Sequence, residues 1–186
     1  MRLWTIQPEE LYEQILRDGK YILDEGRSEN CKDFNQAYNW LKKQMDIKGI
    51  KNNNNLVWAW HTFNGKHHKP DLRCSAYDAR GTKSVCLELE IPDERVLLSD
   101  YNAWHFVLND DYLDTSTNEE EYDKERDWFE HLPFDERQKV KEESWQRIFD
   151  TTYFKNDWVS RGVYVQATFY GLELKDIKKV QHFICK

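Results

Sequence analysis

The sequence predicts an α+β fold with mainly antiparallel strands and flanking helices. Segments with apolar residues at three- and four-residue intervals, typical of helices, occur early and late in the chain. Runs rich in β-branched and aromatic residues, typical of strands, occur in the middle and at the end. Aromatic residues make up 15% of the chain and outweigh the disorder signal of its 33% charged residues, so we expect a folded core.

The elements are expected in a definite order. A strand at 3–6 leads into a helix that opens at Pro8, carries two acids in its first turn and stops at Gly19. Apolar spacing predicts a second helix from Phe34 to Met45. Further strands are expected at 56–63, 72–77, 85–91, 96–98, 104–108, 162–170 and 179–185.

Residues 109–150 form an acidic insertion in what we expect to be a single domain, 1–186. The insertion holds fifteen acids and six bases, a net charge of −9, whereas the whole chain carries −7. Residues 109–127 contain few aliphatic side chains and favour a solvated loop. Residues 135–149 are predicted to be helical, with buried positions at Val140, Trp145, Ile148 and Phe149.

Several functional classes lack their usual signals. The sequence has no phosphate-binding glycine loop, no dinucleotide-binding glycine motif and no metalloprotease or nucleophile-elbow motif. The four cysteines include no C-x-x-C pair, so no metal is expected. No signal segment and no run of roughly 18 apolar residues is present. We therefore expect a cytoplasmic protein with reduced thiols and no membrane contact.

A basic loop supplies the first candidate residues. His61, His67 and His68 lie within eight positions of one another, near several lysines. This segment is either a solvated basic loop or a loop that contacts an anion. Adjacent His67 and His68 would point to opposite faces of an extended chain, which disfavours a metal site. Asp71 and Arg73 would share one face of a strand, either as an ion pair or with Arg73 binding a phosphate or carboxylate bidentately.

Two strand predictions supply further candidates. On a strand, Trp104 and His105 would face opposite sides, with Trp104 in the core and His105 either buried or lining a site. Asp100 would orient His105 through a ring nitrogen or cap the turn. Gln166 and Thr168 would share one polar face of a strand. This face is either exposed to solvent or forms the floor of a binding site.

Four segments carry a resemblance to a known family: LWTIQ (3–7), KPDLR (69–73), LELEIPDERVLLSDYNAWHFVLN (87–109) and VQATFYGLELKDIKKVQHF (165–183). Together they resemble a family of small bacterial proteins that is classed only as a domain of unknown function. The resemblance covers most of the chain outside 109–150 and implies no established activity.

The order of elements is also similar to the ADP-ribosyltransferase fold, including a late turn of the form I-x-x-V at 177–180. That fold clasps NAD between split sheets, with an Arg or His on its first strand and a Glu on its late strand. The resemblance implies Trp4 or Thr5 at the first position and Gln166 at the last. Because a glutamine cannot act as a base, transfer would require Glu173 or another acid.

Three functions follow as hypotheses. The first is an enzyme, or a degenerate one, that binds NAD or a related nucleotide in an aromatic-lined cleft. In this hypothesis Arg73 holds a phosphate, and His61, His105 and Gln166 line the cleft.

The second hypothesis is a nucleic-acid-binding module in which Trp58, Trp60 and Tyr77 act as stacking platforms. The third is a protein-interaction module whose acidic segment 109–150 meets a basic partner. Salt dependence separates nucleic-acid binding from a stacked, buried nucleotide, because phosphate contacts weaken steeply as salt rises.

Overall fold

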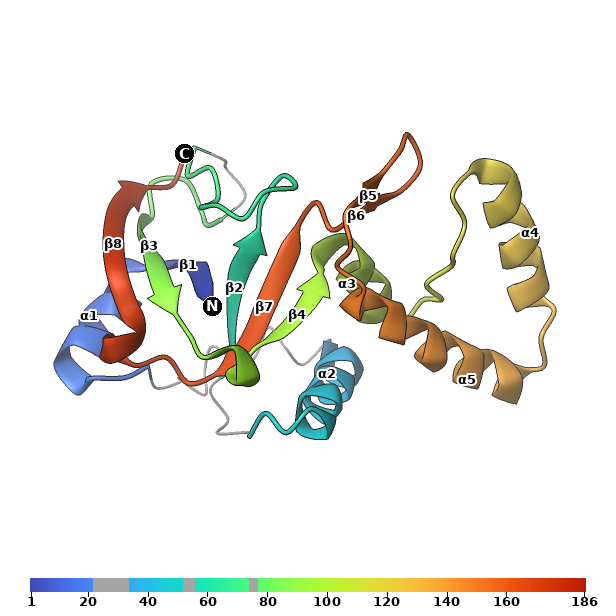
Figure 1. Ribbon diagram of the computed structural model, residues 1–186, viewed down its shortest axis with the longest axis horizontal. Coiled ribbons are helices and arrows are strands. Elements are labelled where there is room, and N and C mark those ends of the chain that lie inside the picture. The colour runs from blue at the N-terminus through green and yellow to red at the C-terminus, as the bar shows by residue number, and fades with distance from the viewer. Residues whose placement is uncertain (22–33, 52–55, 74–76) are drawn as a thin grey trace.

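The computed structural model describes residues 1–21, 34–51, 56–73 and 77–186 (Figure 1). The helices are α1 (Glu9–Asp18), α2 (Asn35–Ile47), α3 (Tyr101–Leu108), α4 (Glu119–Glu130) and α5 (Phe134–Ser144), with short 3₁₀ helices η2 (Asp93–Arg95), η3 (Trp145–Phe149) and η4 (Leu174–Asp176). The strands are β1 (Arg2–Pro8), β2 (Leu56–Thr62), β3 (Lys83–Glu90), β4 (Leu97–Asp100), β5 (Phe154–Lys155), β6 (Ser160–Arg161), β7 (Val165–Tyr170) and β8 (Ile177–Ile184). These elements confirm the α+β class, and no helix in the described ranges has the length and apolar character needed to span a bilayer.

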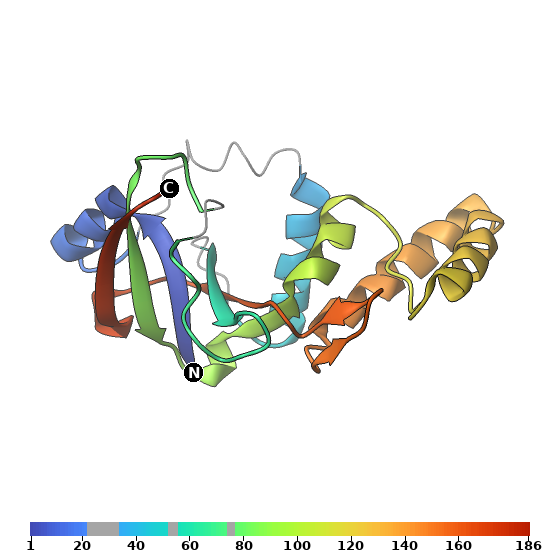
Figure 2. The same cartoon turned by 90° about the horizontal axis from the view of Figure 1, so that it is seen from above.

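The main sheet consists of two three-stranded halves. Its strand order is β4-β7-β2-β1-β3-β8, and all neighbours are antiparallel. β1 pairs with β3 from Arg2 to Pro8, but within the described residues it pairs with β2 only at Trp4 and Trp60. Beyond that pair, Thr5 Oγ1 donates a hydrogen bond to the Trp58 carbonyl at 2.8 Å, so a side chain replaces the backbone ladder. Figure 2 shows β1, β3 and β8 grouped beside α1.

The two faces of the sheet carry separate apolar clusters. On β2, Val57 and Ala59 belong to one cluster, whereas Leu56 and Trp58 pack against the other, as expected from the alternation of a strand. The first cluster lies under α1 and contains Leu3, Leu11, Ile15, Val57, Ala59, Val85, Leu87, Leu89, Ile91, Ala167, Phe169 and Leu172. The second lies under α2, α3 and η3 and contains Ala37, Leu41, Met45, Ile50, Leu97, Trp104, Val107, Trp145, Ile148 and Tyr170.

Residues 104–108 lie in the helix α3, so their prediction as a strand is wrong. Asp100 caps this helix: its Oδ1 accepts a hydrogen bond from Ala103 N at 2.9 Å. Asp100 therefore caps the turn rather than orienting His105, whose Nδ1 contacts the Tyr101 carbonyl at 2.9 Å. The prediction of Trp104 as a core residue is confirmed, because only 4% of it is exposed.

The segment 72–77 is not a strand in its described residues, so this prediction is also wrong. Residues 74–76 lie outside the described ranges. Leu72 and Arg73 form a turn in which Asp71 Oδ1 accepts a hydrogen bond from Arg73 N at 3.0 Å. This local side-chain bond competes with extended backbone and explains the turn.

The acidic segment 109–150, called the arm below, is largely helical and projects away from the sheet (Figures 1 and 2). α4 begins after Asn118, whose Oδ1 accepts a hydrogen bond from Glu121 N at 3.0 Å. Three acids in its first turn suit the positive end of the helix dipole. The expectation of a loop over 109–127 is therefore wrong from Glu119 onward, whereas the predicted helix at 135–149 is confirmed as α5 and η3.

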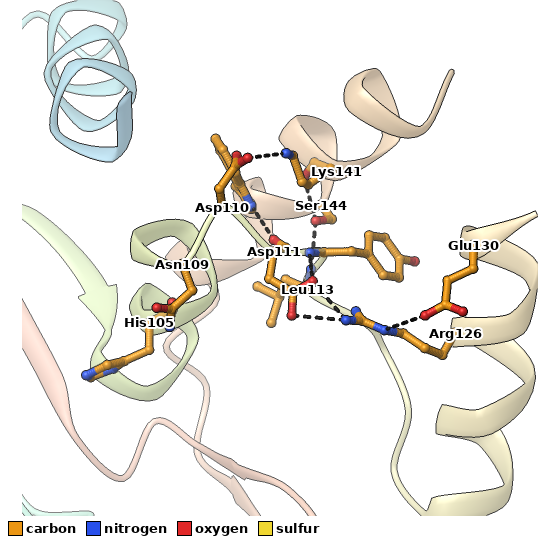
Figure 3. Close-up of polar contacts among 11 residues, drawn as sticks. His105, Asn109, Asp110, Asp111, Leu113, Arg126, Glu130, Lys141 and Ser144 are labelled. Carbon is orange, nitrogen blue, oxygen red and sulfur yellow. Dashed lines mark hydrogen bonds and ion pairs between the residues drawn. The ribbon is translucent and has the colours of Figure 1, made fainter. Parts of the chain in front are cut away.

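Polar and apolar contacts hold the base of the arm. Asp111 pairs with Arg126 at 3.0 Å, and Asp110 pairs with Lys141 at 2.7 Å (Figure 3). Trp145 is 1% exposed, and its Nε1 donates a hydrogen bond to the Asp111 carbonyl at 2.7 Å. The polar contacts therefore tie segments of the arm to one another, whereas Trp145 packs the arm against the rest of the chain in the second apolar cluster, beside Trp40.

Candidate functional site

Cross-strand register places four side chains in one row across the main sheet. Trp4 lies opposite Trp60, Trp60 opposite Gln166, and Gln166 opposite Ser99. Directly opposed residues share a face, so the row crosses both halves of the sheet. The ends of the row are buried, with Trp4 3% and Ser99 0% exposed, whereas Trp60 and Gln166 are half-buried. Among the described residues, Ser99 Oγ has no hydrogen-bond partner.

Half-buried rings surround Trp60 in the middle of the row. Its ring centroid lies 5.3 Å from Tyr101, 5.6 Å from Phe63 and 6.4 Å from Tyr164. We call these four residues the aromatic platform. His105 is exposed and packs edge-on against Tyr101 at 4.7 Å. Partly exposed rings that are fixed by one another offer a rigid surface for stacking a planar heterocycle.

A bulge in β2 sets the position of His61 beside the row. The pairing of β2 with β7 shifts between Trp60 and Thr62, which leaves His61 as the extra residue. Its ring lies 4.3 Å from the ring of His67, which in turn lies 5.1 Å from Trp4. Burial, together with the nearby His67, lowers the pKa of His61 below its usual value, so it is mainly neutral at pH 7.

Three of the predicted site residues serve mainly to hold the strands. Thr5 is 1% exposed and is bonded to β2 through the Trp58 carbonyl. Thr168 is fully buried, and its Oγ1 donates a hydrogen bond to the Leu97 carbonyl at 3.2 Å. Trp4 is buried beneath Arg2, whose guanidinium lies 5.2 Å from the ring centroid. These side chains shape the row from within and offer little surface to a ligand.

Arg73 and Tyr77 each contact Asp71. Arg73 donates to Asp71 through Nε at 2.9 Å and Nη2 at 2.7 Å, and Tyr77 donates to the Asp71 carbonyl at 2.9 Å. The Arg73 guanidinium holds the pKa of the Asp71 carboxyl well below its usual range. Asp71 contacts the guanidinium edge of Arg73 in this structure, as the ion-pair interpretation expects. Because the pair is exposed, it can also exchange Asp71 for a phosphate, so binding of a phosphate by Arg73 stays a prediction.

Glu173 lies beyond the opposite end of β7 from Gln166. Its side chain caps η4 together with Asp176 and pairs with Lys175 at 2.7 Å. The hydrogen bond from Lys175 lowers the pKa of the Glu173 carboxyl. The structure therefore does not bring Glu173 to the row, whereas it brings Trp4, Trp60 and Gln166 together with His61 beside them.

Sequence reasoning missed several residues of this region. Ser99, Phe63 and Tyr164 were not among the candidates, and Tyr101 was not recognised as the neighbour of Trp60. The four-residue spacing of Tyr101 and His105 was an available signal, because it places both on one helix face. The strand assigned to this segment concealed that signal.

Cysteine and metal chemistry receive no support from the described residues. No group of three His, Cys, Asp or Glu side chains there converges as metal ligands do. Cys86 and Cys185 are buried free thiols, and burial raises the pKa of Cys86 to about 11. A thiol with so high a pKa is a poor nucleophile at neutral pH.

Comparisons with known proteins place the chain in a family. Neither a curated protein nor a solved structure matches it. The family model described as Domain of unknown function (DUF3841) matches residues 2–178, which is nearly the whole chain. The chain therefore belongs to the DUF3841 family.

Proposed function

We propose that the chain binds NAD or a related nucleotide at the aromatic platform, beside Gln166. The observation that carries this proposal is the row Trp4–Trp60–Gln166, which crosses from β1 to β2 at the backbone pair of Trp4 with Trp60. The two-halved sheet supports it, because the ADP-ribosyltransferase resemblance implies a ligand held where split sheets meet. Rings of the platform would stack a base or the nicotinamide.

The chemistry of the row favours binding over group transfer. The Gln166 amide both donates and accepts hydrogen bonds and suits a ribose hydroxyl, but it carries no charge and cannot act as a base. His61 is mainly neutral at pH 7 and adds a hydrogen-bonding ring rather than a positive charge. Gln166 has no carboxylate, and Glu173 lies away from the row. Neither of these two positions therefore supplies a carboxylate to the proposed ligand.

Replacing the central ring tests the platform directly. We expect Trp60→Ala to weaken NAD binding by about tenfold or more, because one stacking surface is removed. Isothermal titration calorimetry with NAD and ADP-ribose measures the loss. Trp128→Ala is the matched control, since Trp128 is 49% exposed on α4 and lies outside the row. Equal losses in both variants, or no binding by the wild type, would contradict the proposal; binding only of single-stranded RNA that vanishes with salt would favour the nucleic-acid module.

Restoring a carboxylate to the row tests its relation to transferase chemistry. We expect Gln166→Glu to create or raise NAD cleavage, because a carboxylate can stabilise positive charge that develops on the ribose. Release of nicotinamide measures the reaction. Gln181→Glu, an exposed change on β8, is the control. An unchanged rate in Gln166→Glu would count against Gln166 as the late-strand position of that fold.

A further inference from the structure

A second binding site is suggested by a cavity at the base of the arm. The cavity has a volume of about 610 Å³ and lies among the start of α3, the segment 113–117, α4, η3 and the β5–β6 hairpin. Sites for small molecules usually measure ~300–1,000 Å³. No residue of the aromatic platform lines it, so it is distinct from the proposed nucleotide site.

Aromatic side chains line part of this cavity and remain partly open to solvent. Phe154 is 38% exposed and Trp158 is 47% exposed, although both belong to residue types that are usually buried. The Trp158 ring lies 5.8 Å from Tyr122, which fixes its position from the arm. Phe106 on α3 adds a further ring to the lining. Exposed rings that face one cavity offer stacking surfaces to a planar ligand.

Two arginines also line the cavity. Arg161 pairs with Asp150 at 2.8 Å, but both side chains are about two-fifths exposed, at 41% and 44%. Such a pair is weak and exchanges readily with another anion. Arg147 donates a hydrogen bond to the neutral carbonyl of Leu113, and its guanidinium also lies 5.8 Å from the Tyr112 ring centroid and interacts electrostatically with the Glu125 carboxylate. Guanidinium groups bind phosphates and carboxylates in preference to neutral groups.

The other carboxylates of the lining are occupied within the protein. Asp100 is 1% exposed and accepts hydrogen bonds from Ala103 N at 2.9 Å and Gly162 N at 2.7 Å. Asp114 accepts hydrogen bonds from both the backbone and the hydroxyl of Ser116. Their lone pairs are directed to these donors, so they oppose an anion less than free carboxylates would.

We propose that this cavity binds a small planar aromatic anion, a ring system that carries a phosphate or carboxylate group. The ring packs against Phe154 and Trp158, and the anionic group contacts Arg147 and Arg161. The hydroxyl groups of residues 115–117 line the same cavity, but each donates its proton to a carboxylate of the protein, Glu125, Asp114 or Glu121. Recognition of the anionic group therefore depends on the two guanidinium groups. The arm thus completes a ligand site together with the β5–β6 hairpin.

Equilibrium dialysis with naphthyl phosphate, naphthoate and neutral naphthol tests this proposal. We expect at least one of the two anions to bind about tenfold or more tightly than naphthol, because the guanidinium groups recognise the charge. The preference between the anions identifies the ligand as a phosphate or a carboxylate. Absence of binding by both anions, or equal binding of naphthol, would overturn the proposal.

Three variants locate the site. Trp158→Ala should weaken anion binding by about tenfold, whereas Trp128→Ala, which removes a similarly exposed ring outside the lining, should leave it unchanged. Asp150→Asn should tighten binding by up to about fivefold, because it releases Arg161 from its ion pair. Equal losses in both tryptophan variants, or weaker binding in Asp150→Asn, would refute this location. Binding of the naphthyl anion that survives Trp60→Ala separates this site from the aromatic platform.

Discussion

Gly162→Ala should lower the free energy of unfolding by about 3 kcal/mol or more. Gly162 has a φ of +67°, and a Cβ at this position would lie 2.6 Å from the Thr151 carbonyl oxygen and 2.8 Å from Tyr153 N. Both atoms belong to the backbone, which cannot move aside as a flexible side chain can. Gly162 N also donates a hydrogen bond to the buried Asp100 at 2.7 Å, so any shift of this turn disturbs the cap of α3.

A second glycine separates the two contributions to this loss of stability, the close contact of the added Cβ and the positive φ angle. Gly49 has a φ of +76°, but a Cβ there would meet no atom within 4 Å. Gly49→Ala should therefore cost only about 1 kcal/mol, the cost of placing a side chain in the left-handed region. Thermal unfolding should show a melting temperature lower by ~6–12 °C for Gly162→Ala. Equal shifts in the two variants would mean that the backbone contact at Gly162 contributes nothing.

Trp145→Ala should lower the free energy of unfolding by about 3–5 kcal/mol, the usual cost of removing a buried tryptophan. The Trp145 ring is 1% exposed and packs edge-on against Trp40, with centroids 5.5 Å apart. Its Nε1 donates a hydrogen bond to the Asp111 carbonyl, so the substitution also removes a contact at the base of the arm. Urea unfolding followed by circular dichroism measures the change.

Two further substitutions divide this effect into its parts. Trp145→Phe retains most of the ring but removes the Nε1 donor, and we expect a loss of about 1–3 kcal/mol from the unpaired Asp111 carbonyl and the smaller ring. Trp128→Ala should change stability by no more than ~0.5 kcal/mol, because its side chain is half exposed. A loss in Trp145→Ala as small as that in Trp128→Ala would contradict the packing at the base of the arm.

Local signals in the sequence were sufficient for most of the secondary structure. The stop at Gly19 is confirmed by its left-handed conformation, with a φ of +75° at the C-cap of α1. The helix predicted from Phe34 to Met45 is confirmed as α2, within one or two residues at each end. These elements were predictable because a single side chain or a repeating apolar spacing decides their ends.

The segment after Asp100 could be read in two ways. Trp104 and its neighbours have high strand propensity, but that preference depends on packing and is weak in a short segment. The cap at Asp100 and the burial of Trp104 with Val107 on one helix face outweigh it. The sequence contained both the helix cap and the residues of high strand propensity, and the prediction followed the strand propensity.

The candidate site was less predictable than the fold. Trp4, Trp60 and Gln166 were each singled out, but their meeting depends on pairing between segments that are far apart in sequence. A shift of one residue would send the side chains to the other face. The bulge at His61 adds such a shift within β2 itself. Strand register is a tertiary property, and no local spacing encodes it.

The division of the sheet into halves has a consequence for the order in which the chain can fold during synthesis. The half β4-β7-β2 uses only residues between Leu56 and Tyr170. The half β1-β3-β8 draws on both ends of the described chain, because β3 pairs with β1 on one side and with β8 on the other. β3 therefore emerges from the ribosome with an open edge that β8 covers in the folded sheet, so this half completes its hydrogen bonding after translation of Ile177–Ile184.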